Sequence, residues 1–141
     1  MRTALLLGLS ALVLSPLACG GDGGNGGYCQ SDSDCGNGNV CARDESCWPS
    51  GDVHSVKITW TIGGQPAGSD ACSQFPDFFV NFYSQTEDFG FAPVPCMAGE
   101  FPVDKLPTAY SAVELGDVNY QYFDQTMSID ENGSASFDLV P

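Results

Sequence analysis

Hydrophobic and polar residues alternate along several stretches of the second half of the chain. In VHSVKITWTIGG, which starts at Val53, the apolar residues Val56, Ile58, Trp60 and Ile62 stand at every second position, with Lys or Thr between them. A period of two is that of a strand with one buried face, and the pair Gly63-Gly64 would end it. The pattern therefore predicts a half-buried strand from residue 53 to residue 62.

Further short runs of the same kind follow. DFFVNFYS (77–84), AYSAVEL (109–115) and VNYQYFDQTMSI (118–129) are expected to be strands, the last of them one or two. In IDENGSASFDLV we expect a hairpin, with residues 130–133 as the turn and Gly133 supplying a positive φ. No ten-residue window has a helical period. The prediction is an all-β chain, with a single antiparallel β-sandwich of about seven strands over 53–141.

The stretch PCMAGEFPVDKLPTAYSAVEL (95–115) adds a resemblance. Its pattern G-x-F-x-x-x-x-L-P-x-x-Y, leading into a strand, resembles that of transthyretin-like or carboxypeptidase-regulatory-like sandwiches. The residues that carry the likeness are Gly99, Phe101, Leu106, Pro107 and Tyr110. The resemblance implies a structural or interaction module, and other Ig-like sandwiches are the alternative.

The first residues have the layout of a secretory signal. A positive head, Met1-Arg2-Thr3, precedes the apolar run 4–14, which is too short for the roughly 20 residues of a membrane span. Leu17-Ala18-Cys19 then resembles the lipobox of bacterial lipoproteins, which implies a signal peptide at 1–18 and a lipid-bearing Cys19. Gly20, in place of an aspartate, implies the outer membrane or cell surface. Pro16 departs from the lipobox pattern, so a soluble secreted protein is the alternative.

Residues 19–28 are expected to join this anchor to the folded part. The tract GGDGGNGG (20–27) has almost no side chains to bury, so it should be a flexible coil with an extent of roughly 15 Å. A tethered domain gains clearance from a lipid surface through such a segment.

The chain has seven cysteines, an odd number for a secreted protein. Assigning Cys19 to lipid leaves six, which we expect to form three disulfides. Four of them recur every six residues in a polar stretch (29–52) that can hold no core, so crosslinks must stabilise it. Zinc is the competing interpretation, but zinc ligands usually come in closer CxxC-type pairs. The predicted disulfide cysteines are Cys29, Cys35, Cys41, Cys47, Cys72 and Cys96.

The clustered cysteines carry a second resemblance. The acidic opening SDSDC (31–35) and GNVC (38–41) resemble the cysteine-rich repeat of the Dickkopf N-terminal region. Their connectivity is open, since four cysteines allow three pairings. A calcium loop starting at Asp32 would need glycine at its sixth position and glutamate at its twelfth, where Asn37 and Arg43 stand. We therefore interpret these acids as turn formers.

Charge and composition exclude several functions. The chain has 18 acids against four Lys or Arg and a formal net charge of −14, so it should repel phosphate backbones and bind no nucleic acid. His54 is the only histidine and no GxSxG motif is present, so we expect no catalytic site, no metal and no cofactor.

Aromatic residues are the remaining candidates for recognition. Phe89 and Phe91 are expected in a loop with Gly90, where they would either cover the end of the sandwich or form a patch for a protein or carbohydrate partner. The sequence thus predicts a membrane-anchored surface lipoprotein that acts as a non-catalytic binding or structural module. The alternative is a soluble secreted cysteine-rich protein with a protease-inhibitor or adhesion role.

Overall fold

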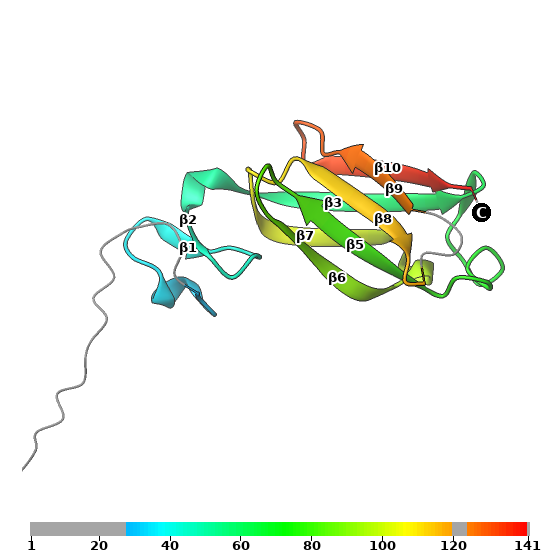
Figure 1. The fold of residues 1–141 in the computed structure, drawn as a ribbon, viewed down its shortest axis with the longest axis horizontal. Helices are drawn as coiled ribbons and strands as arrows, with labels where there is room; N and C mark the ends of the chain where they lie inside the picture. The colour runs from blue at the N-terminus through cyan, green and yellow to red at the C-terminus, as the bar shows by residue number, and fades with distance from the viewer. Residues whose placement is uncertain (1–27, 120–123, 141) are drawn as a thin grey trace, which may run out of the picture.

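The computed structural model describes residues 28–119 and 124–140 of the 141-residue chain. The expected signal segment (1–18), the lipid-bearing Cys19 and the glycine tract up to residue 27 lie outside these ranges, as do residues 120–123. Within the described ranges, no helix is long and apolar enough to cross a membrane. The chain first forms a small module, residues 28–52, and then a larger one from residue 53 (Figure 1).

The small module, called the disulfide module below, is built of short elements that have little apolar surface. A two-stranded antiparallel ribbon pairs β1 with β2 and places Cys41 opposite Cys47. None of its 3-10 or strand residues is fully buried, because crosslinks take the place of a core. Its elements are η1 (Asp32–Asp34), β1 (Asn39–Cys41), β2 (Cys47–Pro49) and η2 (Ser50–Asp52).

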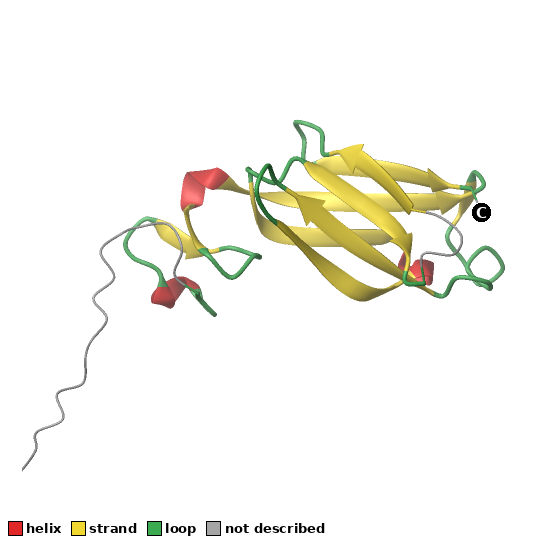
Figure 2. Ribbon diagram, in the orientation of Figure 1, coloured by secondary structure: helices red, strands yellow, loops and turns green. Residues whose placement is uncertain are grey.

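The larger module is a sandwich of two four-stranded sheets (Figure 2). One sheet consists of β3 (Val53–Ile62), the two-residue β4 (Gln65–Pro66), β7 (Glu100–Pro107) and β10 (Ser134–Leu139). The other runs in the order β6 (Asp88–Pro95), β5 (Asp77–Tyr83), β8 (Ala112–Asp117) and β9 (Asp124–Ser128). Apart from β4 these are seven strands, so the predicted all-β sandwich is confirmed.

The hydrophobic core lies between the two sheets, and alternation along each strand selects its members. On β3 the predicted apolar face is buried, and on β5 every second residue, Phe78, Val80 and Phe82, is fully buried. The Trp60 and Phe78 rings meet edge to face across the sheets, with centroids 5.7 Å apart. The Cys72–Cys96 disulfide closes the far end, where the Trp60 indole N–H donates to the Cys96 carbonyl oxygen at 2.8 Å.

The C-terminal strand corrects two expectations. β10 pairs with β3 in parallel, from Ser134 opposite Lys57 to Leu139 opposite Ile62, so the sandwich is not wholly antiparallel. The turn at 130–133 is present and Gly133 has a φ of 74°, but β9 belongs to one sheet and β10 to the other. The predicted hairpin is therefore wrong, because the strands on either side of the turn separate into different sheets.

The expectation of a loop around Phe89 and Phe91 is also wrong. Both residues lie on β6, which pairs with β5 from Asp77 opposite Pro95 to Tyr83 opposite Asp88. The glycine and prolines of β6 resemble a loop in the sequence, but proline is tolerated in an edge strand, whose outer side needs no donor. β7, with Pro102 and Pro107, is the corresponding edge strand of the other sheet and pairs only with β3 among the described strands.

Candidate functional site

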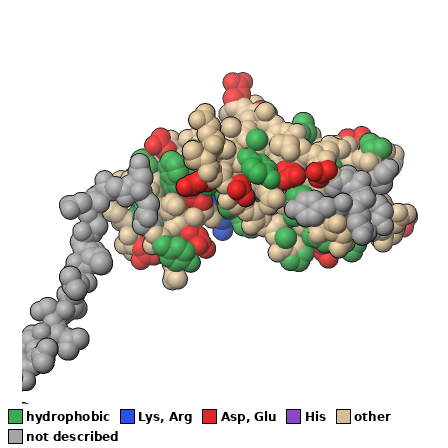
Figure 3. Space-filling model, viewed as in Figure 1, with side chains coloured by type: hydrophobic (Ala, Val, Ile, Leu, Met, Phe, Trp, Pro, Cys, Tyr) green, Lys and Arg blue, Asp and Glu red, His purple; other side chains and the backbone are tan. Residues whose placement is uncertain are grey.

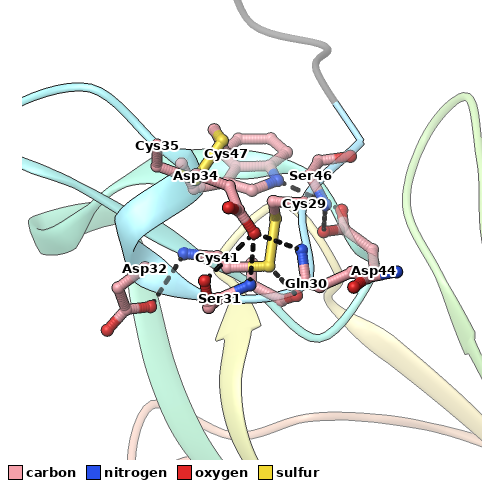
Figure 4. Close-up of a disulfide and its surroundings, with 12 residues drawn as sticks. Cys29, Gln30, Ser31, Asp32, Asp34, Cys35, Cys41, Asp44, Ser46 and Cys47 are labelled. Atoms are coloured by element: carbon pink, nitrogen blue, oxygen red, sulfur yellow. Dashed lines mark hydrogen bonds between the residues drawn. A yellow bond between two sulfur atoms is a disulfide. The ribbon is translucent and has the colours of Figure 1, made fainter.

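Two disulfides pair the clustered cysteines in an interleaved order. Cys29 joins Cys41 and Cys35 joins Cys47, with Cα–Cα distances of 5.7 and 5.5 Å (Figure 4). The sulfurs of Cys29, Cys35 and Cys47 all lie within 4.8 Å of one another. Each of them is already bonded to another sulfur, so none of these atoms is a thiolate that could bind a metal.

The aspartates that were considered for a calcium loop accept hydrogen bonds from other groups of the disulfide module. The Asp34 carboxylate accepts hydrogen bonds from the backbone N–H groups of Gln30 and Ser31, at 2.9 and 2.8 Å, and from the Ser31 hydroxyl. These bonds lower the pKa of Asp34. Asp32 accepts from the Cys41 N–H at 3.0 Å. The arrangement is the turn chemistry that the sequence favours, and it already engages both side chains.

The loop between β1 and β2 is shaped by one aspartate. The Asp44 carboxylate accepts from the Ser46 N–H and from the Trp48 indole N–H, both at 3.1 Å. It also accepts from the Tyr110 hydroxyl of the sandwich at 3.5 Å. Burial, and then the Asp44 charge, raises the pKa of Tyr110 to about 12. Asp44 thus organises its own loop and contacts the larger module.

A β-bulge on β7 aims a lysine at the disulfide module. The register between β3 and β7 shifts between His54 and Val56, and Lys105 adopts a φ of 54° there. The Lys105 ammonium contacts both carboxylate oxygens of Asp32, at 2.7 and 2.8 Å, and its carbonyl oxygen accepts from the Arg43 N–H at 3.0 Å. The Lys105 hydrogen bonds and the Cys41 N–H hold the pKa of Asp32 below its usual range.

A cavity of about 820 Å³ lies where the disulfide module meets the edge of the sandwich. We call it the junction cavity. In the space-filling view, basic atoms are visible between the two modules, whereas acidic side chains are spread over both (Figure 3). Its lining consists of Tyr28, Cys29, Gln30, Ser31, Asp32, Cys41, Ala42, Arg43, Glu45, Phe91, Asp104 and Lys105.

Several uncommon features of the chain meet at the junction cavity. Arg43 and Lys105 line it, although the chain has only four Lys and Arg residues. Glu45 and Lys105 line it as well, and these are the two non-glycine residues with positive φ in the described part of the chain. Such backbone conformations are costly and concentrate at functional sites. The junction cavity is therefore the candidate site.

The mouth of the junction cavity carries an exposed aromatic ring. Tyr28 is 73% exposed, and a hydrogen bond with Glu45 raises the pKa of its hydroxyl. Arg43 is exposed as well, and its guanidinium forms no ion pair with any described residue. A ligand could therefore stack on the exposed Tyr28 ring and accept hydrogen bonds from the Arg43 guanidinium.

The two phenylalanines predicted as a ligand patch meet edge to face on β6, with centroids 5.6 Å apart, but only Phe91 lines the junction cavity. The Phe89 ring stacks on Phe82 and meets Tyr110 edge to face, with centroids 5.5 and 4.9 Å apart. Phe91 contacts Phe101 of β7 at 5.1 Å and also lines the junction cavity. Both rings are half-buried and pack against the core. Phe89 thus helps to close the sandwich, while Phe91 alone belongs to the candidate site.

The single histidine lies on β3, beside the strand β7 that carries Lys105. His54 stands opposite Leu106 in the β3–β7 ladder. Its Nε2 is buried and has no hydrogen-bond partner. A general base must lie within hydrogen-bond reach of a nucleophile or its orienting group, and no such contact to His54 is present among the described residues.

Sequence reasoning did not find most of the site. Tyr28, Arg43, Glu45 and Lys105 were not singled out as binding residues, because none belongs to a motif. The isolated position of Arg43 and Lys105 in a strongly acidic chain is the one signal that could have pointed to them.

Comparison with known proteins does not place the chain in a family. No protein-family model matches the chain, and neither a curated protein nor a solved structure matches it significantly.

Proposed function

We propose that this chain is a lipid-anchored protein of the outer membrane or cell surface that acts as a non-catalytic binding module. Leu17-Ala18-Cys19 supports the anchor, and so does the cysteine count, because assigning Cys19 to lipid leaves an even number for the three disulfides. The anchor would hold the protein at the membrane, and the folded modules would meet the ligand.

The observation that carries the binding role is the junction cavity. Hydrogen bonds from the Lys105 ammonium to Asp32 and from the Arg43 N–H to Lys105 join the two modules beside it. A site whose walls are fixed before the ligand arrives loses less free energy in ordering them. The volume of the cavity falls within the range of small-ligand sites, and two aromatic rings stand among its polar groups.

The soluble inhibitor alternative has less support. A protease inhibitor presents a rigid exposed loop to its target, and the loop 42–46 lies between the disulfide cysteines Cys41 and Cys47. That loop is turned toward the sandwich, where Arg43 donates its N–H to Lys105 and Asp44 accepts from Tyr110. Its backbone is thus engaged within the chain.

Intact-mass measurement on protein from the native membrane fraction tests the anchor. The expected mass starts at Cys19 with added acyl chains, and the six remaining cysteines become alkylated only after reduction. A Cys19→Ala variant should lose the lipid and leave the membrane fraction. A wild-type mass without acyl chains, together with one thiol that reacts before reduction, would contradict the anchored form and favour the soluble one.

A further inference from the structure

We propose that the junction cavity binds a short neutral oligosaccharide. This inference depends on the proposed role as a surface binding module and adds the chemical class of the ligand. With about 820 Å³, the cavity falls within the range of sites for ligands of a few rings. Three properties of the lining argue for a sugar: its aromatic rings, its mixture of hydrogen-bonding groups and its balance of charge.

The aromatic rings offer stacking faces. Tyr28 is 73% exposed at the mouth of the cavity, far more than is usual for a large ring. Phe91 contributes a second ring from β6. The C–H faces of a pyranose are apolar and slightly positive, so they complement the negative face of an aromatic ring. A ligand that covers Tyr28 would bury an exposed apolar surface.

The polar groups of the lining both accept and donate hydrogen bonds. The carboxylates of Glu45 and Asp104 are acceptors only, the Arg43 guanidinium is a donor only, and the Gln30 amide is both. A ligand that matches such an alternating set must itself donate and accept at neighbouring positions. Sugar hydroxyls do this, because each carries one donor and two acceptor lone pairs.

The lining carries three carboxylates and two basic side chains, so its charges nearly cancel and favour an ion of neither sign strongly. An anion would meet three carboxylates, those of Asp32, Glu45 and Asp104, in a chain with a net charge of −14. A cation would meet Arg43 and the Lys105 ammonium, which is already paired with Asp32. A neutral ligand avoids both desolvation costs.

The test titrates the full chain, purified from membranes in detergent, with maltotriose, cellotriose and mannotriose, followed by calorimetry and by amide NMR shifts. Trigalacturonate and trilysine serve as the charged comparators. At least one neutral trisaccharide should bind in the millimolar range or tighter and shift the amides of Tyr28, Arg43 and Phe91. Removing one stacking ring with Tyr28→Ala should weaken binding by about tenfold.

Two further variants sharpen the comparison. Arg43→Gln keeps a hydrogen-bond donor on a shorter side chain without the charge and should weaken binding by a few fold. The matched control for Tyr28→Ala is Met97→Ala, because Met97 is 62% exposed in η3 (Cys96–Ala98) at the other end of the sandwich (Figure 2). It should leave binding unchanged. All three positions are exposed, so folding should be preserved, and circular dichroism checks it.

Several results would overturn the sugar proposal. These are the absence of binding by any neutral trisaccharide, tighter binding of trigalacturonate or trilysine, and binding that Tyr28→Ala and Arg43→Gln leave intact. The acyl mass on Cys19 is measured separately. An acylated protein that ignores these sugars would overturn the ligand class and leave the anchored module, whereas a sugar-binding protein without lipid would do the reverse.

Discussion

The Lys105 ammonium on β7 contacts both carboxylate oxygens of Asp32 in the disulfide module, at 2.7 and 2.8 Å. Seventy-three residues separate the two in sequence. The pair stands beside the Arg43 N–H bond to the Lys105 carbonyl. Through these contacts a bulged residue of the sandwich sets the position of the small module and so the shape of the junction cavity.

This relationship predicts how the junction responds to acid. The folded state lowers the pKa of Asp32 below its ordinary value of 3.8. A depressed carboxyl pKa contributes stability that is fully present above 3.8 and is lost as the pH falls through the lower, folded-state value. The protection factor of the Arg43 amide hydrogen, which compares its exchange rate measured by NMR with the intrinsic rate at the same pH, should fall over that acid window as the contact weakens.

Two variants serve as test and control for the acid response. Asp32→Asn removes the ionisable group, so this part of the acid response should disappear and Arg43 should exchange faster even at neutral pH. Asp138→Asn is matched, because Asp138 also has a lowered pKa, through the Gly64 N–H and the Thr61 hydroxyl at the far end. It should speed amide hydrogen exchange at Gly64 and leave the exchange rate of Arg43 unchanged. An equal effect of both variants on Arg43 would contradict a local role for the pair.

A second prediction concerns the turn that leads into β10. Gly133 has a φ of 74°, and a Cβ atom there would lie 2.4 Å from the Ser55 carbonyl oxygen. Gly133→Ala should lower the free energy of unfolding by about 1–3 kcal/mol, measured by urea denaturation. Gly51→Ala is the control, because a Cβ at Gly51 meets nothing within 4 Å. It should stay within about 0.5 kcal/mol of wild type. Equal losses in both variants would contradict this explanation.

The Cys72–Cys96 disulfide supplies a third prediction. The bond closes a span with a sequence separation of 24 residues, for which the chain-entropy model gives roughly 3 kcal/mol. Replacing both cysteines by alanine should lower the free energy of unfolding by about that amount. The slope of the urea transition should rise slightly, because the unfolded chain exposes more surface. An unchanged midpoint would mean that the unfolded chain already keeps this region compact.

The fourth prediction concerns His54. Its Nε2 is buried without a hydrogen-bond partner, which costs free energy relative to an apolar group of similar size. His54→Leu should therefore raise the free energy of unfolding by about 1 kcal/mol. His54→Asn, which keeps a polar group at the position, should not. Ligand binding should survive both changes, and its loss in His54→Leu with a raised stability would instead indicate a functional histidine.

Local patterns predicted the strands whose alternation is regular. The buried face of β3 was clear from the sequence, since Val56, Ile58, Trp60 and Ile62 stand at every second position and all are buried. β6 and β7 were missed because their glycine and prolines are usual in loops. They are edge strands, where proline costs no ladder hydrogen bond. The Asp130–Gly133 turn was found, but not the sheets to which its two sides belong, because that depends on partners distant in sequence.

The candidate site was less predictable for a related reason. The junction cavity joins residues 28–45 to residues 91–105, and no short motif spans them. The cysteine spacing predicted the disulfides, but the interleaved pairing of Cys29 with Cys41 needed the structure. Lys105 reaches the module only because a bulge gives it a φ of 54°. Because lysine has no preference for a positive φ, the sequence does not indicate this conformation.

The parallel pairing of β3 with β10 also gives the molecule a mechanical character. β3 leaves the disulfide module, and β10 ends at the opposite pole, where Val140 follows (Figure 1). Tension between the two poles would pull these strands in opposite directions along a shared axis. The hydrogen bonds between residues 57–62 and 134–139 would then bear the load simultaneously in shear, and would not break one after another.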